Sequence, residues 1–159
     1  MTTDVTDTGV GTIRSGFLGG GFMAQVHSRA ARAAGATTAV LASSTPDRAA
    51  QAARELGIDR AARDVDELLS GEADIVHVCT PNATHTALAL RVIDAGKHVI
   101  CEKPLATTLA EARELAAAAT ERGVVAAVPF VYRYHPMVRE ARARVAAGEI
   151  GALLTVDCG

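Results

Sequence analysis

The sequence predicts an α/β fold, a doubly wound parallel sheet with helices on both faces. Short apolar runs rich in Val, Ile and Leu alternate along the chain with longer stretches of helical periodicity. Only 3% of the 159 residues are aromatic and none is Trp, so aliphatic side chains must build the core, as they do in parallel sheets. A glycine-rich loop follows the first apolar run, where such folds turn from strand to helix.

That loop reads GFLGGGFMA from Gly16 to Ala24 and follows a strand predicted at 13–18. Gly19, Gly21 and Ala24 have the G-x-G-x-x-G/A spacing. Small residues at these places allow a sharp turn, close approach of the backbone to a diphosphate, and close packing of helix on strand. The loop therefore predicts a dinucleotide site in a Rossmann fold, with an ordinary flexible turn as the alternative.

The following helix is predicted from Phe22 to Ala34, so Phe22 and Met23 form its first turn and its free N–H groups face the diphosphate. A second strand predicted at 37–42 supplies the βαβ context that a glycine fingerprint requires. This context favours the cofactor interpretation over a plain turn.

The second strand ends at Ser43 and Ser44, where the adenosine ribose of a dinucleotide would lie. An acidic residue about 20 positions after the glycines would favour NAD, but this chain has hydroxyls there. Together with Arg48 they predict a 2′-phosphate contact and favour NADP slightly over NAD. The nearby Asp47 fits better as a first-turn residue of a helix capped by Thr45.

The capped helix is predicted to begin at Pro46, reach Leu56 and end at Gly57. A minor strand at 61–63 and a short helix at 65–69 follow. The apolar run at 74–79 predicts a strand covered on both faces, with His77 as a core histidine.

The loop after that strand contains Thr80, Asn82 and His85, and a helix predicted at 86–95 follows it. Asn82 fits a turn or helix cap as well as a ligand contact. His85 stays open between a cofactor contact and a surface position in the first helical turn.

The strand predicted at 97–101 runs into Glu102, Lys103 and Pro104. A proline restricts the residue before it and makes a cis bond accessible, so Lys103 would be held where the nicotinamide end of a cofactor should reach. The charged pair directly after a buried strand indicates a functional role.

The last elements are predicted from capping and stop signals. Thr108 and Glu111 match a capping box for a helix that Gly123 ends. The remaining predictions are a strand at 124–128, a helix at 137–147 and a final strand at 153–156. The only tyrosines, Tyr132 and Tyr134, either line a cleft or act as packing anchors.

Net charge is −2 and the basic residues are scattered, which argues against nucleic acid or an anionic membrane as a partner. The three cysteines, Cys79, Cys101 and Cys158, have no metal or disulfide spacing and are interpreted as buried, reduced thiols. Residues 1–12 lack the pattern of a signal peptide, and no apolar run approaches the ~20 residues that span a bilayer. The expected location is the cytoplasm.

In that order and at those intervals, GFLGGGFMA, CTPNATH, CEKPLA and YRYHP resemble the glucose-fructose oxidoreductase / inositol dehydrogenase (Gfo/Idh/MocA) family, from Ile13 to the last residue. The resemblance implies an NAD(P)-binding domain followed by a substrate domain. Hydride would move between the nicotinamide and a sugar, polyol or related carbonyl compound. The predicted organisation is a disordered arm at 1–12, a Rossmann domain at 13–148 and, at 149–159, the first strand of a truncated α+β substrate domain.

The resemblance also implies residue roles. Gly19 and Gly21 would contact the diphosphate. Thr80, Asn82 and His85 would flank the ribose and diphosphate, and Glu102 would face the nicotinamide ribose. Lys103 would be catalytic, orienting the substrate hydroxyl and favouring its deprotonation. Arg133 would contact cofactor or substrate.

Two departures from the family pattern limit these expectations. Ser44 occupies the place of a common arginine, which puts phosphate recognition in question. The substrate domain and its proton-transferring histidine are absent from the sequence, so the chain alone is expected to show no turnover, and a homo-oligomer is expected only with that domain. The alternatives are a non-catalytic NAD(P)-binding sensor or an NAD-dependent glycosidase on the same scaffold.

Overall fold

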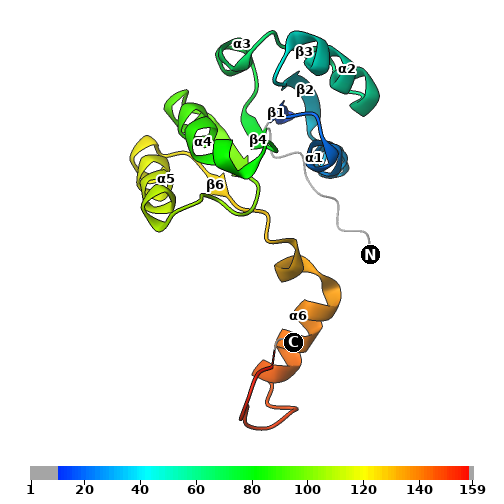
Figure 1. Ribbon diagram of the computed structural model, residues 1–159. Helices are drawn as coiled ribbons and strands as arrows, with labels where there is room; N and C mark the ends of the chain where they lie inside the picture. Colours follow the sequence, from blue (N-terminus) through cyan, green and yellow to red (C-terminus); the bar gives the residue numbers. More distant parts are fainter. Residues whose placement is uncertain (1–10, 158–159) are drawn as a thin grey trace. The chain divides into compact units, whose positions relative to one another are not determined.

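The computed structural model describes residues 11–157, which divide into two compact units at Val128 and Pro129 (Figure 1). The first unit contains a six-stranded sheet in the order β3-β2-β1-β4-β5-β6, in which neighbouring strands are parallel. The strands are β1 (Arg14–Leu18), β2 (Thr37–Ala42), β3 (Arg60–Ala61), β4 (Ile75–Val78), β5 (His98–Cys101) and β6 (Ala126–Ala127). This strand order confirms the doubly wound Rossmann prediction.

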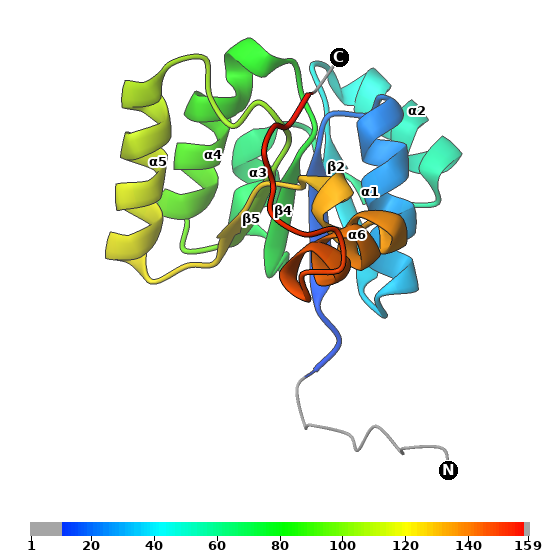
Figure 2. The same ribbon diagram turned by 90° about the horizontal axis from the view of Figure 1, so that it is seen from below.

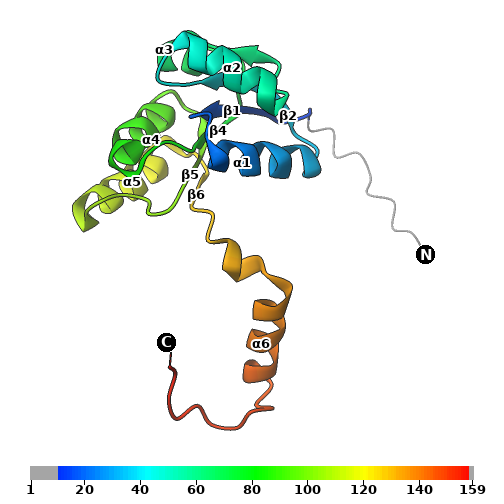
Figure 3. The same cartoon turned by 45° about the vertical axis from the view of Figure 1, so that its right-hand side comes forward.

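Five helices accompany the sheet in this unit: α1 (Phe22–Ala33), α2 (Pro46–Leu56), α3 (Val65–Ser70), α4 (His85–Asp94) and α5 (Leu109–Arg122). Successive strand residues face opposite sides, so β1 places Phe17 in one core cluster with α1 and α2 and Leu18 in another with α3, α4 and α5. Figures 1 and 2 show α4 and α5 side by side, and Figure 3 shows α1 alongside β1.

The local start and stop signals work as predicted. The Thr45 side chain accepts a hydrogen bond from the backbone N–H of Arg48 at the start of α2, and Gly57 ends that helix with φ 64°. Thr108 and Glu111 form both bonds of the capping box at the start of α5. These caps satisfy backbone groups that each helix end leaves without an internal partner.

The sheet edges and the C-terminal segment differ from the prediction. Strand β6 is shorter than the predicted 124–128, and both of its residues are exposed. Residues 153–156 are exposed and form no strand, because a strand needs a ladder partner and none pairs with them in the described chain. Residues 153–156 come after the two helices of the second unit, the short 3₁₀ helix η2 (Val131–Tyr134) and the α-helix α6 (Pro136–Ala146).

The predicted domain limits remain predictions. The first compact unit ends at Val128, earlier than the expected boundary at 148/149. Residues 1–10 of the predicted arm and Cys158 lie outside the described residues. None of the helices within residues 11–157 is long and apolar enough to cross a membrane.

Leu68 tests the core on the α3 side of the sheet. It is fully buried, so Leu68→Ala should lower the free energy of unfolding by about 2–5 kcal/mol through lost burial and a residual cavity. Leu109→Ala, at a position that is 67% exposed, should change it by less than about 0.5 kcal/mol. Urea unfolding of both variants measures the difference, and equal effects would contradict this assignment of the core.

Candidate functional site

A cavity of about 720 Å³ opens at the carboxyl edge of the sheet, between β1 and β4 where the strand order reverses. Ligands of open α/β sheets bind at this reversal point. Its lining includes the expected residues Gly19, Gly21, Phe22, Met23, Ser43, Ser44, Arg48 and Thr80. It also includes residues that the sequence interpretation did not assign to the cofactor: Leu18, Gly20, Ala42, Val65, Cys79, Pro81, Thr84 and Leu88.

Two of the three loop glycines, Gly19 and Gly20, leave no room for a side chain, whereas Gly21 faces open space. Gly19 has φ +97°, and a Cβ there would lie 2.8 Å from the carbonyl oxygen of Cys79. A Cβ on Gly20 would lie 2.5 Å from the Cβ of Ala52. A Cβ on Gly21 would meet nothing within 4 Å. Gly19 and Gly20 therefore serve the packing of the loop, and Gly21 leaves open space beside the start of α1.

Helix α1 starts at this open space without a side-chain cap. Gly21 occupies the N-cap position, no side chain bonds to it, and no acidic residue lies in the first turn. Phe22 and Met23, the first residues of the helix, line the cavity. Free N–H groups and the positive end of a helix dipole favour a bound anion, so the cradle fits a diphosphate.

Hydroxyls and a guanidinium lie at the end of β2. Arg48 Nη1 donates to Ser44 Oγ at 3.2 Å, and Ser43 lines the same cavity. A neighbouring hollow of about 290 Å³ includes Arg48 together with Gln51 and Glu55. Gln51 Nε2 donates to the Glu55 carboxylate at 2.8 Å. This end of the site therefore offers a cation and two hydroxyls to a ribose or its phosphate, with one carboxylate close by.

The loop after β4 is a short 3₁₀ helix, η1 (Asn82–Thr84). Thr84 Oγ1 donates at 2.7 Å to the carbonyl oxygen of Pro81 and also lies 2.7 Å from Thr80 Oγ1. Asn82 is exposed and does not line the cavity. Thr80 reaches the cavity, and Thr84 shapes the turn.

His85 is buried, so its interpretation as a surface residue is wrong. Nδ1 lies 2.8 Å from the carbonyl oxygen of Pro104, and Nε2 lies 2.9 Å from that of Thr80. A neutral imidazole supplies one N–H and a protonated one supplies two. The ring thus ties the loop after β4 to the loop after β5, and neither nitrogen is free for a ligand in this arrangement. Contact with a cofactor remains a prediction.

Glu102, Lys103 and Pro104 lie directly after β5, and the Lys103–Pro104 bond is cis. Glu102 is buried, and its Oε2 accepts the backbone N–H of Lys103 at 2.9 Å. The Lys103 side chain is exposed. A fixed carboxylate and an accessible ammonium therefore stand together at the carboxyl end of the strand next to β4.

Two buried histidines that sequence reasoning did not connect with the site are linked to Glu102. His27 contacts Glu102 itself, and His77 contacts His27. His27 of α1 places Nε2 3.0 Å from Glu102 Oε1, and its Nδ1 lies 3.0 Å from Nδ1 of His77 in β4. Burial, followed by the charge of His27, lowers the pKa of His77 to about 3, so His77 is neutral. His77 is a core histidine as predicted, but no spacing in the sequence indicates its link to His27.

The cysteines within residues 11–157 are free, as predicted. Cys101 is buried, whereas Cys79 is only half-buried at the cavity wall. Burial, and next the negative charge of Glu102, raises the pKa of both thiols to about 12. The thiols are therefore protonated near neutral pH and are poor nucleophiles. No group of His, Cys, Asp and Glu that could hold a metal occurs in the described residues.

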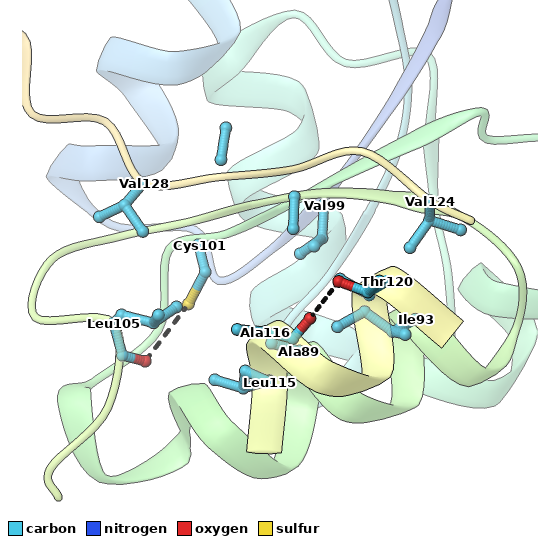
Figure 4. Close-up of a pocket in the computed structure, with 13 residues that line it drawn as sticks. Ala89, Ile93, Val99, Cys101, Leu105, Leu115, Ala116, Thr120, Val124 and Val128 are labelled. Atoms are coloured by element: carbon cyan, nitrogen blue, oxygen red, sulfur yellow. Dashed lines mark hydrogen bonds between the residues drawn. The ribbon is translucent and has the colours of Figure 1, made fainter. Parts of the chain in front are cut away.

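A second cavity, of about 340 Å³, lies between α4, α5 and strands β5 and β6 (Figure 4). Its walls are almost entirely aliphatic. Its polar groups are occupied: Thr120 Oγ1 donates to the Ala116 carbonyl, and Cys101 Sγ lies 3.9 Å from the Leu105 carbonyl. This cavity has packing surfaces but no group for catalysis. Arg133 belongs to the second compact unit, in η2, where its side chain is exposed.

Comparisons with known proteins agree with this geometry. The family model described as "Oxidoreductase family, NAD-binding Rossmann fold" matches residues 13–130. The chain is 35% identical over 150 residues to levoglucosan dehydrogenase of Pseudarthrobacter phenanthrenivorans, covering 88% of this chain and 38% of that protein. It is 42% identical over 123 residues to 1,5-anhydro-D-fructose reductase of Ensifer adhaerens, covering 77% of this chain and 37% of that protein.

A solved structure of levoglucosan dehydrogenase in complex with NADH and levoglucosan is 34% identical, with a TM-score of 0.85, and covers 91% of this chain and 42% of that one. The chain therefore spans about two fifths of the length of these relatives. Sequence and fold agree throughout the matched region: the chain belongs to the Gfo/Idh/MocA oxidoreductase family, with an NAD-binding Rossmann fold.

Proposed function

We propose that this chain holds NAD or NADP at the carboxyl edge of its sheet and forms the cofactor-binding part of a sugar or polyol oxidoreductase. The observation that carries the proposal is the glycine cradle, in which Gly19 and Gly20 pack tightly and Gly21 leaves open space before an uncapped helix. With no side chain at Gly21, the backbone N–H groups at the start of the helix can come close to a diphosphate. Both NAD and NADP fit the family.

Different parts of the cofactor would lie over the two halves of the sheet. Gly21 and the start of α1 would hold the diphosphate, and Ser43, Ser44 and Arg48 would hold the adenosine ribose beyond β2. Glu102 and Lys103 follow β5 in the other half, where the nicotinamide of a dinucleotide belongs. A bound nicotinamide supplies the hydride donor or acceptor.

Lys103 would orient a substrate hydroxyl in this arrangement, because an ammonium stabilises negative charge that develops on an alkoxide oxygen. The Lys103 side chain does not line the cavity, but it is exposed just after the carboxyl end of β5, which supports that role. The two relatives are named a levoglucosan dehydrogenase and a 1,5-anhydro-D-fructose reductase. A sugar or polyol is accordingly the proposed substrate class, chosen by parts of the enzyme beyond the two fifths matched here.

Two further assignments follow from the same proposal. Residues 13–148 form the cofactor domain, and residues 149–159 begin the next domain. The unpaired thiols of Cys79 and Cys101 support a reducing compartment such as the cytoplasm.

Substitutions at Gly19 and Gly21 test the cradle, because one should lower the stability of the fold and the other should weaken cofactor binding. Gly21→Ala should leave the fold intact, because Gly21 has φ −87° and its Cβ would meet nothing. The added methyl should weaken NAD(P)H binding roughly 10-fold or more by occupying the space that the diphosphate needs. Calorimetric titration with NADH and NADPH measures the affinity.

Gly19→Ala is the matched control. Its positive φ and its clash with the Cys79 carbonyl should lower the unfolding free energy by at least about 1–2 kcal/mol. Unchanged cofactor affinity in a folded Gly21→Ala chain would show that the cradle does not hold the diphosphate.

Arg48 tests the cofactor preference. Arg48→Ala should weaken NADPH binding about three- to ten-fold and leave NADH binding nearly unchanged, because only NADPH offers a 2′-phosphate to the guanidinium. Arg54→Ala, on the same helix but outside both hollows, should affect neither cofactor. Tighter binding of NADH than of NADPH by the unmodified chain would overturn the preference for NADP.

A further inference from the structure

Three buried side chains form one hydrogen-bonded chain through the first compact unit. His77 of β4 contacts His27 of α1 through their Nδ1 atoms at 3.0 Å. His27 Nε2 contacts Glu102 Oε1, also at 3.0 Å, and Glu102 Oε2 accepts the Lys103 N–H. All three residues are more than nine-tenths buried. The chain joins the helix that begins at the glycine loop, a central strand, and the segment that carries Lys103.

The hydrogen bonds are directional and set the role of His27. Glu102 accepts at Oε2 from the Lys103 N–H, and an ionised carboxylate can only accept at Oε1 as well. Against a carboxylate oxygen at 3.0 Å, the imidazole is the donor, through the N–H at Nε2. If His27 is neutral, its bare Nδ1 accepts a hydrogen bond from the N–H at His77 Nδ1; if His27 is protonated, it donates to both neighbours. In either state Glu102 receives a hydrogen bond from His27.

Core packing alone does not account for this arrangement. Apart from Phe17 and Cys101, the two core clusters consist of aliphatic and alanine side chains, which pack without side-chain hydrogen bonds. Burying polar groups lowers stability unless they are hydrogen-bonded, and apolar side chains of similar volume are often as stable or more so. His77 does gain packing, since it stacks on Phe17 with ring centroids 4.8 Å apart. Stacking on Phe17 accounts for an aromatic ring at position 77 but not for the hydrogen bond between His77 and His27.

We propose that His27 and His77 are positioning residues that hold the Glu102 carboxylate in a single orientation for the nicotinamide half of the cofactor. The inference rests on the proposed NAD(P) site. His27 is the central member, because it lies on α1 and bonds to the segment after β5. It thus couples the diphosphate end of the site to its nicotinamide end. His77 orients His27 from β4.

The test compares a dinucleotide with its adenosine half. His27→Leu removes both hydrogen bonds and keeps an apolar side chain, whereas His27→Gln can still donate to Glu102 and accept from His77. Calorimetry on the 159-residue chain measures Kd for NADPH or NADH, whichever the unmodified chain binds tighter, and for ADP. His27→Leu should weaken dinucleotide binding roughly 10-fold with ADP affinity within about two-fold, and His27→Gln should restore most of the loss.

Two further variants sharpen the comparison. His98→Leu removes a histidine at the opposite end of the sheet, at the first residue of β5, and should leave the ratio of the two affinities unchanged. Glu102→Leu, which removes the acceptor altogether, should weaken dinucleotide binding at least as much as His27→Leu, and the double variant should lose little more than Glu102→Leu alone, because His27 acts through Glu102. Fully additive losses would overturn the proposal.

The outcomes separate the inference from the function beneath it. If the unmodified chain binds neither dinucleotide nor ADP, the proposed function fails. If it binds both and His27→Leu keeps the ratio, or if a folded His27→Gln restores nothing, the positioning role fails. Nitrogen-15 NMR of the unmodified chain gives an answer even if His27→Leu does not fold. A His27 ring with a protonated Nε2 is expected, and a bare Nε2 would overturn the proposal.

Discussion

The structure depends on the pairing of β1 with both β2 and β4, since this central position is where the two halves of the sheet meet. Parallel registers on both sides leave β1 no exposed edge. Its alternation then supplies one side chain to each core, Phe17 on one face and Leu18 on the other. The end of the same strand leads into Gly19, whose backbone packs against the end of β4. Fold and cofactor cradle thus share one strand.

The buried imidazoles and the buried carboxylate of the described residues are linked to loops at the carboxyl edge of the sheet, whereas buried hydroxyls such as Thr38 also occur toward the opposite edge. At the carboxyl edge, His85 ties the loop after β4 to the cis-proline loop, and His27 and His77 support Glu102. These buried groups have bonding partners, and no buried side-chain nitrogen or oxygen in the described residues lacks one. Satisfied polar networks restrict a site to one arrangement, because each bond that breaks leaves a costly unpaired group. The histidine networks reach the edge where chemistry is proposed, while the opposite edge holds surface ion pairs such as Arg14–Asp74.

Most of the fold could be predicted because its signals are local. Strand β2 matches its predicted limits, and α2 begins and ends at its predicted cap and glycine. The capping box was also predictable, since it depends on residues within a few positions of one another, whereas Pro104 only made the observed cis bond accessible. Of the cofactor residues, the glycines and the β2 end reach the cavity as expected, because the loop and strand ends carry them there.

The sequence by itself determined the α/β class, the glycine loop, the places of the helices and the family, since local propensity and spacing encode these features. Only the tertiary structure decided what the interior histidines do. His85 is separated by 19 positions from the Pro104 carbonyl that it contacts, and His27 by 75 from Glu102. The same is true of strand pairing, which 153–156 does not achieve although its side chains favour it. A hydrogen bond needs two groups at about 3 Å, and for groups far apart in the chain the packing of helices on the sheet, rather than any periodicity, sets that distance.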